Sequence, residues 1–418
     1  MKGTLLHQLF AAHDFELTET GSPSTIPVDH IYGHDRNTFK IVNEVTNVMG
    51  KDLSGMRGMD RFRLYMDHYS PPPTIELAQL HVQQRRIARE HGATLNEIGS
   101  GVGHQIGLEQ YIGGGQVVIG VDTHTCTAGA LGALAFRQPH NASAEALASG
   151  MARFFMPDIL RIEFVGELRP ECGAKDIALR MGMEGEELYE GKLLEIGGPG
   201  LRSLGMSGRF TLANLSVDLH ARTALLETDD VTRDYLEQHG RGSTFFPLQS
   251  DPSAYSEVHV VDLATVVPMV AFPPSIFFSR PVEECAEPLH LDVVTVGSCT
   301  NGRYEDFIDF MEQFGNGPVA PGTRLIATPA SRDIYLQLLH EGILDRLVTA
   351  GAVVNPPGCG PCMGLHQGIL YEDEVCLATG SINRPGRMGS KSAQVLLAGP
   401  KVAGISARTG YLTAPVMN

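Results

Sequence analysis

Short apolar runs rich in valine, isoleucine and leucine recur along the chain, and most lead into a polar or glycine-rich turn followed by helical spacing of apolar residues. Runs of this length between turn residues are typical of buried β-strands. The alternation of strands and helices predicts an α/β fold with mostly parallel sheets flanked by helices. The runs that support this prediction are 117–121, 159–166, 291–296, 324–328, 352–355 and 375–379.

Helical spacing is clearest in residues 74–91, which follow three prolines at 71–73 and end at Gly92. Proline before such a segment and glycine after it are typical of helix boundaries. We therefore expect a crossover helix at 74–91, similar helices at 303–314 and 331–341, and a first helix near the N-terminus.

Two changes in composition suggest domain boundaries. The polar segment GELRPECGAKD follows the strand at 159–166, and the proline-rich stretch 268–288 has the composition of an exposed linker. A chain of 418 residues is long enough for several domains of ordinary size. We expect three α/β domains, at 1–155, 156–280 and 281–418.

Composition and charge limit the classes of function. With 32 Lys and Arg against 48 Asp and Glu, the net charge is −16, which disfavours nucleic-acid binding and attachment to anionic membranes. No uncharged apolar run approaches the roughly 20 residues of a membrane-spanning helix, and no cleavable signal is visible. Seven scattered cysteines are unlike a secreted disulfide framework. We expect a reduced, cytoplasmic setting.

The strongest chemical signal is NPPGCGPCMG, in which Cys359 and Cys362 form a Cys-x-x-Cys pair after a predicted strand. Cys299, in VGSCTNGR, also follows a strand, at the kind of position where α/β folds bind ligands. Three thiolates on two such loops are able to bind one metal centre. A redox pair or half of a zinc site is the alternative from spacing alone, although no second Cys-x-x-Cys completes a zinc ribbon.

Acidic residues stand near histidines at three places. Asp67 precedes His68, Asp122 lies two residues before His124, and His104 has an acid five residues after it. A carboxylate beside an imidazole fixes the ring's tautomer and raises its basicity, as proton transfer requires. A structural hydrogen bond is the alternative for any single pair.

Three arginines are candidates for binding an anion. Arg384 and Arg387 follow the strand at 375–379, and Arg303 lies four residues after Cys299. Guanidinium groups suit bidentate recognition of carboxylates, and here they would oppose the negative net charge locally. Ordinary solvated arginines are the alternative.

Taken in order, the motifs DH, GHQ, DTHTCTAGALGALA, AKD, RFTLANLSVD, VGSCTNGR, GCGPCMG and NRPGRMG resemble the aconitase superfamily. The resemblance covers nearly the whole chain and is strongest to the large subunits of 3-isopropylmalate dehydratase and homoaconitase. It implies a three-domain aconitase-like core. It also implies the large catalytic subunit of an iron–sulfur hydro-lyase, which dehydrates and rehydrates a hydroxy di- or tricarboxylate in leucine or related amino-acid biosynthesis.

The resemblance also assigns roles to residues. Cys299, Cys359 and Cys362 would bind a [4Fe–4S] cluster whose fourth iron stays open as a Lewis acid. His104 would pair with Asp218, from the second domain. The implied catalytic residues are Asp67, His68, His104, Asp122, His124 and Asp218, and the implied substrate-binding residues are Thr123, Arg303, Arg384 and Arg387.

Four features depart from the family pattern. Asp218 replaces a glutamate, Thr123 replaces a serine, the NRPGR loop is two residues shorter than usual, and RQPHNAS replaces a glycine-rich segment. We expect these changes to reshape the substrate pocket. The chain is expected to lack the mobile C-terminal domain of fused aconitases, so that a small partner subunit supplies this swivelling domain and its serine base.

Other functions remain open at this stage. Homoaconitase or dialkylmalate dehydratase-like activity would act on a different alkylmalate, and a non-catalytic member would keep only the fold. A structural zinc protein would bind zinc and no iron.

Overall fold

The computed structural model describes residues 3–285 and 287–416. The chain forms two compact units, each made of segments that are separate in sequence. The first comprises the chain up to Ile98, Ile106–Val165 and Tyr189–Val261, and the second comprises Gly99–Gln105, Gly166–Leu188 and the chain from Asp262 onward. The division into three domains stays a prediction.

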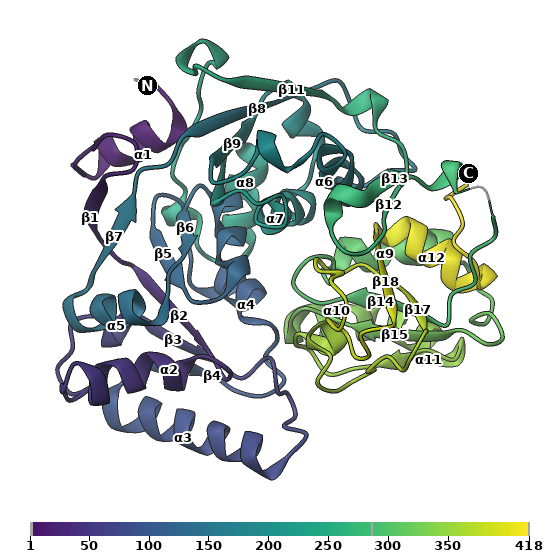
Figure 1. Ribbon diagram of the computed structural model, residues 1–418, viewed down its shortest axis with the longest axis horizontal. Helices are drawn as coiled ribbons and strands as arrows, with labels where there is room; N and C mark the ends of the chain where they lie inside the picture. The colour runs from purple at the N-terminus through teal and green to yellow at the C-terminus, as the bar shows by residue number, and fades with distance from the viewer. Residues whose placement is uncertain (1–2, 286, 417–418) are drawn as a thin grey trace. The chain divides into compact units, whose positions relative to one another are not determined.

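The first unit contains a five-stranded parallel sheet (Figure 1). Because its strands are parallel, their carboxyl ends share one edge, where α/β sheets bind ligands. Helix α3 (Ile75–His91) begins after Thr74, whose hydroxyl accepts from the Leu77 N–H, and ends at Gly92 with φ of 81°. The strand order is β4 (Thr94–Asn96), β3 (Phe62–Tyr65), β2 (His30–His34), β5 (Val117–Gly120) and β6 (Leu134–Arg137).

The same unit contains two further sheets. One has the order β10 (Thr223–Leu226), β9 (Leu193–Gly197), β8 (Ile159–Val165) and β11 (Val258–Asp262), with β8, β9 and β10 parallel. The other pairs β1 (Pro23–Pro27) with β7 (Met151–Phe155) in antiparallel fashion. The remaining helices are α1 (Leu5–Ala12), α2 (Thr38–Asn43), α5 (His140–Ser149), α7 (Met206–Leu215) and α8 (Asp230–Gln238), while α4 (Gly103–Gln110) begins in the second unit and ends in the first.

The second unit is built on a seven-stranded sheet. Its order is β13 (Ser279–Pro281), β12 (Met269–Ala271), β18 (Gln394–Ala398), β17 (Val375–Ala378), β14 (Val293–Gly297), β15 (Arg324–Thr328) and β16 (Val353–Val354), and the last five strands are parallel. Helices α9 (Tyr304–Phe314) and α12 (Pro400–Thr409) pack side by side (Figure 1). The other helices are α6 (Ala174–Gly182), α10 (Arg332–His340) and α11 (Ile343–Thr349).

The α/β prediction with mostly parallel sheets is confirmed, and each of the six predicted strands and three predicted inner helices overlaps an observed element. The exposed linker at 268–288 is wrong. Met269, Val270 and Ala271 are completely buried in β12, which pairs with β13 on one side and β18 on the other. The prolines that suggested a linker flank this short strand instead of interrupting it.

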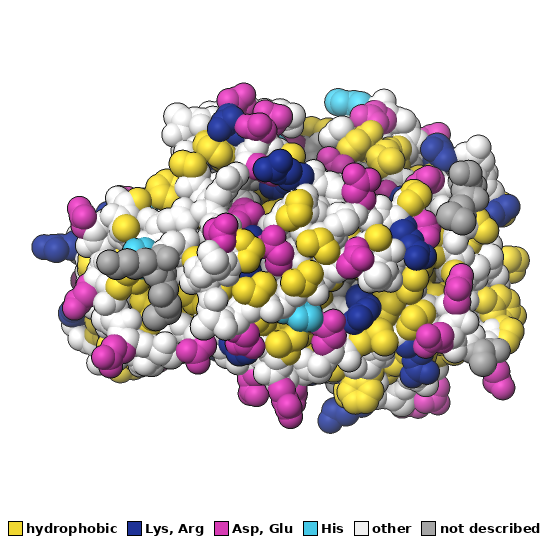
Figure 2. Space-filling view, turned by 90° about the horizontal axis from the view of Figure 1, so that it is seen from above, with side chains coloured by type: hydrophobic (Ala, Val, Ile, Leu, Met, Phe, Trp, Pro, Cys, Tyr) yellow, Lys and Arg dark blue, Asp and Glu magenta, His cyan; other side chains and the backbone are white. Residues whose placement is uncertain are grey.

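The surface carries mixed charge on the face shown in Figure 2, where acidic and basic side chains are interspersed. Within the described ranges, we find no helix with the length and apolar character that crossing a bilayer requires. The seven cysteines, all of which are described, form no disulfide bond.

Candidate functional site

The carboxyl edge of the five-stranded sheet gathers acidic and histidine side chains from three neighbouring strands. His34 ends β2 and Asp35 follows it, Asp67 and His68 follow β3, and Asp122 follows β5. These strands are adjacent in the sheet, so the side chains meet although they are far apart in sequence, as His34 and Asp122 are. All but Asp122 are buried.

Asp67 and His68 form the pair that the sequence predicted. The Nδ1 atom of His68 lies 2.7 Å from Oδ1 of Asp67, and the Tyr32 hydroxyl donates to Oδ2 of the same carboxylate at 3.0 Å. Burial disfavours a charged imidazole, but the carboxylates of Asp67, Asp35 and Asp122 outweigh it and raise the pKa of His68 to about 9. His68 is therefore a cation at neutral pH, with one ring nitrogen held by Asp67.

Asp35 is a fully buried carboxylate that the sequence analysis did not single out. Its oxygens accept the backbone N–H groups of His68 and Tyr69, at 3.2 and 2.9 Å, and Nε2 of His81 lies 3.1 Å away. Asp35 therefore fixes the loop that carries His68.

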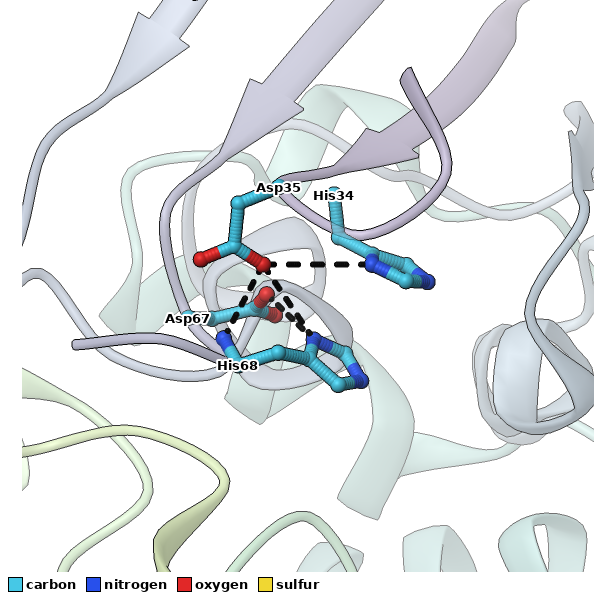
Figure 3. A group of neighbouring side chains, drawn as sticks. All are labelled: His34, Asp35, Asp67 and His68. Atoms are coloured by element: carbon cyan, nitrogen blue, oxygen red, sulfur yellow. Dashed lines mark hydrogen bonds and ion pairs between the residues drawn. The ribbon is translucent and has the colours of Figure 1, made fainter. Parts of the chain in front are cut away.

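His34 was also missed, and it stacks directly on His68 with ring centroids 4.0 Å apart. Figure 3 shows the two imidazoles and the carboxylates of Asp35 and Asp67 gathered at the strand ends. The sequence does contain the signal, because His34-Asp35 is an adjacent histidine–acid pair like Asp67-His68. The pattern of apolar residues does not reveal it, because the short strand that it ends contains two histidines.

These four residues also satisfy a distance criterion for a metal site, since one ligand atom from each lies within 4.8 Å of the others. However, both oxygens of Asp35 accept backbone hydrogen bonds, and His68 is bonded to Asp67. An ion would have to displace these bonds. We therefore interpret the group as a hydrogen-bonded network of carboxylates and imidazoles.

Asp122 and His124 lie at the start of the 3-10 helix Thr123–Leu131. Oδ1 of Asp122 accepts the backbone N–H of His124 at 2.9 Å, whereas it lies 3.8 Å from the ring atom Nδ1, too far for a hydrogen bond. The ring's closer partner is Asp218, whose Oδ2 lies 3.3 Å from Nε2. Thr123, which lies between Asp122 and His124 in sequence, is half-buried.

Asp218 reaches His124 because helix α7, which precedes it, packs on that 3-10 helix. Asn214 in α7 donates from its amide to the Thr127 hydroxyl at 2.9 Å. This pairing of residues 94 positions apart was not predicted. The predicted pairing of His104 with Asp218 is not tested and stays a prediction.

In the second unit, the three candidate cysteines follow parallel strands. Cys299 comes two residues after β14, and Cys359 and Cys362 lie in the loop after β16. Cys299 and Cys359 are buried and Cys362 is half-buried. A small pocket lies against Cys359 and Cys362 and is also lined by the strand-end residues Gly297 and Ser298.

The backbone between Cys359 and Cys362 lies very close to Thr328, at the end of β15. Gly360 has φ of 62°, and a Cβ atom there would lie 2.6 Å from the Thr328 hydroxyl oxygen. Three buried or half-buried thiols on strand-end loops, with a pocket beside two of them, are a donor set that fits an iron–sulfur cluster. This fit rests on donor chemistry and burial, and the pocket supports it.

Arg303 is buried, and its guanidinium group is bonded to the protein. It donates to the carbonyl oxygens of Thr300 and Cys299, both at 2.8 Å, and to the side chain of Gln105 at 2.9 Å. Arg303 therefore stabilises the loop that carries Cys299. Its role in binding substrate stays a prediction.

The two arginines of the NRPGR loop differ in environment. Arg384 is exposed, whereas Arg387 is half-buried and donates from Nη2 to the sulfur of Cys362 at 3.4 Å. Lys175, from the AKD motif, is fully buried and donates to the carbonyl oxygens of Thr379 and Gly380, just before this loop. His104 is buried at the start of α4.

Comparison with known sequences decides the family. The aconitase family (aconitate hydratase) matches residues 72–410 of the chain. The chain belongs to the aconitase family.

Individual relatives support the same assignment. The chain is 42% identical to the 3-isopropylmalate dehydratase large subunit of Elusimicrobium minutum, over 84% of each chain. It is 34% identical to large subunit 1 of the Thermotoga maritima enzyme, over 99% of each chain. It is 38% identical to a protein of Methanothermobacter thermautotrophicus named as a probable methanogen homoaconitase large subunit, over 85% of this chain and 84% of that one.

Among solved structures, the chain is similar to aconitase X of Thermococcus kodakaraensis, with a TM-score of 0.48 and 12% identity over 98% of this chain and 94% of that one. A similarity of this size adds nothing to the family assignment.

Proposed function

We propose that the chain is the large catalytic subunit of an iron–sulfur hydro-lyase of the 3-isopropylmalate dehydratase type. It would remove water from a hydroxy di- or tricarboxylate and add it back on the neighbouring carbon. The observation that carries the proposal is the buried Asp67–His68 pair, which holds a proton at neutral pH in a chain 42% identical to such a large subunit.

Cys299, Cys359 and Cys362 are the residues that would hold a [4Fe–4S] cluster. When bound, a cluster with one open iron supplies a Lewis acid for the substrate hydroxyl and a carboxylate. Arg387 contributes a hydrogen bond to the Cys362 sulfur, and Arg303 fixes the Cys299 loop.

The proton chemistry belongs to the residues of the first unit. His68 keeps its Nδ1 bonded to Asp67, so that Nε2 is the ring atom able to give a proton to the departing hydroxyl. Asp122, which is partly accessible, would position the water that returns. His124, oriented by Asp218, provides a second imidazole for proton transfer.

We assign substrate recognition to Arg384 and Arg387, because guanidinium groups bind carboxylates in a bidentate manner. We also assign it to Thr123. A small partner subunit would complete the enzyme, since several similar chains are named large subunits. His104 is retained as a third proton-transfer candidate.

The experiment is anaerobic reconstitution with iron and sulfide, followed by assay with a co-expressed small subunit on a panel of hydroxy acids. We expect turnover of 3-isopropylmalate and loss of at least about 100-fold in the His68→Asn variant. Cluster binding without turnover of any substrate would favour a non-catalytic family member. Zinc in place of iron would exclude the proposal.

A second substrate has specific support, because the chain is 38% identical to the protein named as a homoaconitase large subunit. The same panel therefore includes homocitrate and other alkylmalates. Faster turnover of homocitrate than of 3-isopropylmalate would move the assignment to that branch.

A further inference from the structure

His34 has a position that the proposed chemistry does not yet use. It ends β2, it is buried, and its backbone N–H donates to the Asn37 side chain at 2.9 Å. Its ring stacks on that of His68 at an interplanar angle of 21°. Two imidazoles in such contact cannot both be charged at low cost, because like charges repel strongly in a buried site.

The backbone decides which of the two rings carries the proton. The N–H of Arg36 donates to Nδ1 of His34 at 3.1 Å, so this nitrogen must present its lone pair and cannot carry a hydrogen. A neutral imidazole with an unprotonated Nδ1 has its hydrogen on Nε2. His68 is in the opposite situation, because its Nδ1 faces the Asp67 carboxylate at 2.7 Å.

The Nε2 atoms of both rings point toward the same acceptor. Oδ2 of Asp122 lies 3.6 Å from Nε2 of His34 and 3.9 Å from Nε2 of His68. Both distances exceed the length of a hydrogen bond, and catalytic contacts that are long before substrate binds often shorten into hydrogen bonds in the substrate complex. The titratable groups beside the two rings or Asp122 include Tyr32, Asp35, Asp67 and His124, and His81 lies against Asp35.

We propose that His34 is a positioning residue that stays neutral as the Nε2–H tautomer, donates to Asp122 and thereby leaves the proton of the stacked pair on His68. Asp122 is then kept ionised by a donor, and His68 is the only acid of the pair. The inference rests on the proposed function for its catalytic meaning. Its physical content, the location of two protons, does not depend on turnover.

The direct test is nuclear magnetic resonance of the full chain with ¹⁵N-labelled histidine, assigned with the variants His34→Gln and His68→Gln. At pH 7.5 we expect the ring nitrogens of His34 to report a neutral Nε2–H tautomer and those of His68 to report an imidazolium. A charged His34, an Nδ1–H tautomer of His34 or a neutral His68 would overturn the inference, whether or not the protein turns over a substrate.

A second test uses the pH profile of the reconstituted enzyme with its small subunit. His34→Phe keeps a stacked ring but removes the donor to Asp122, and losing a hydrogen bond to a carboxylate raises its pKa. We expect the acidic limb of kcat/KM to move up by about one pH unit, and to move by less than half as much in His34→Gln, which keeps an N–H. Equal shifts in both variants, or no shift in either, would contradict the inference. A wild-type enzyme without any turnover would contradict only the proposed function, because the magnetic resonance test measures the protonation of His34 and His68 without turnover.

Discussion

At the scale of single residues, the site is organised by carboxylates that fix imidazoles. Asp67 holds His68, Asp218 holds His124, and Asp35 holds the backbone under His68. Asp67 contacts only Nδ1 of His68, and Asp218 contacts only Nε2 of His124, so the other nitrogen of each ring faces away from that carboxylate. The result is a set of rings with fixed orientations, which is what stepwise proton transfer requires.

The clearest consequence concerns pH. Burial opposes the charge on His68, while Asp67 is the largest of the effects that raise the pKa of His68 to about 9. A reaction that needs protonated His68 loses rate as pH rises through this value. In Asp67→Asn the pKa of His68 falls, so we expect the alkaline limb of the pH–rate profile to move to lower pH and the rate at pH 8 to fall at least about tenfold.

The control for this prediction is Asp60→Asn, because Asp60 is exposed and near the same strand. Its profile should match that of the wild type. An unchanged alkaline limb in Asp67→Asn would show that His68 is not the acid.

At the scale of elements, sequence patterns predicted strands that are continuous apolar runs and helices with clear boundaries. Residues 324–328 are β15 without any change of boundary, and α3 ends at Gly92 as expected. Strand β2 was missed because its sequence, HIYGH, is buried throughout yet contains two histidines. Its histidine side chains are polar although they are buried, so a hydrophobicity pattern cannot reveal the strand.

The same reasoning explains which parts of the site were predictable. Asp67 and His68 are adjacent in sequence, so their contact could be expected from the chain alone. Asp218 and His124 meet only because α7 packs on the 3-10 helix Thr123–Leu131, and no local pattern contains that information. The prediction of an exposed linker at 268–288 is wrong because β12 has only three residues and lies between prolines. So short an apolar run does not indicate a strand.

Strand β12 gives a test that separates a strand from a linker. Limited proteolysis of the native protein should not cut at Met269–Ala271, because these residues are buried between β13 and β18. Val270→Asp, which places a charge in that position, should destabilise the fold by about 3 kcal/mol or more in urea denaturation. Rapid cleavage within this segment in the native protein would contradict the assignment.

Helix α1 depends on a distant side chain. Glu195 is fully buried and accepts the backbone N–H groups of Leu5 and Leu6 at 2.6 and 2.8 Å, at the start of the helix. Replacing it with alanine leaves these donors and the Tyr255 hydroxyl without their acceptor. We expect Glu195→Ala to lower the free energy of unfolding by about 2–3 kcal/mol, measured in urea.

The matched control is Glu190→Ala, which removes an exposed carboxylate near the same strand and should change stability by less than about 0.5 kcal/mol. If Glu195→Ala were as stable as this control, Glu195 would not anchor the helix.

At the scale of the whole molecule, the two units carry different chemistry. The first holds the histidine–carboxylate pairs Asp67–His68 and His124–Asp218, and the second holds the three cysteines and the arginines of the NRPGR loop. Neither set alone performs a dehydration of the proposed kind, which needs both a Lewis acid and a proton donor. The chain as a whole has a net charge of −16. The positive charges of Arg384 and Arg387 therefore make the NRPGR loop the place where we expect an anionic substrate to bind.

The central claim is that Cys299, Cys359 and Cys362 hold the cluster on which this activity depends. The most direct measurement is the iron and sulfide content of anaerobically reconstituted protein, compared between wild type, Cys359→Ser and Cys376→Ser. Cys376 is buried in β17 and serves as the control. We predict iron and sulfide in the wild type and in Cys376→Ser, and a loss of most of both in Cys359→Ser. Equal iron content in all three proteins, or a wild type that takes up zinc and no iron, would contradict the account.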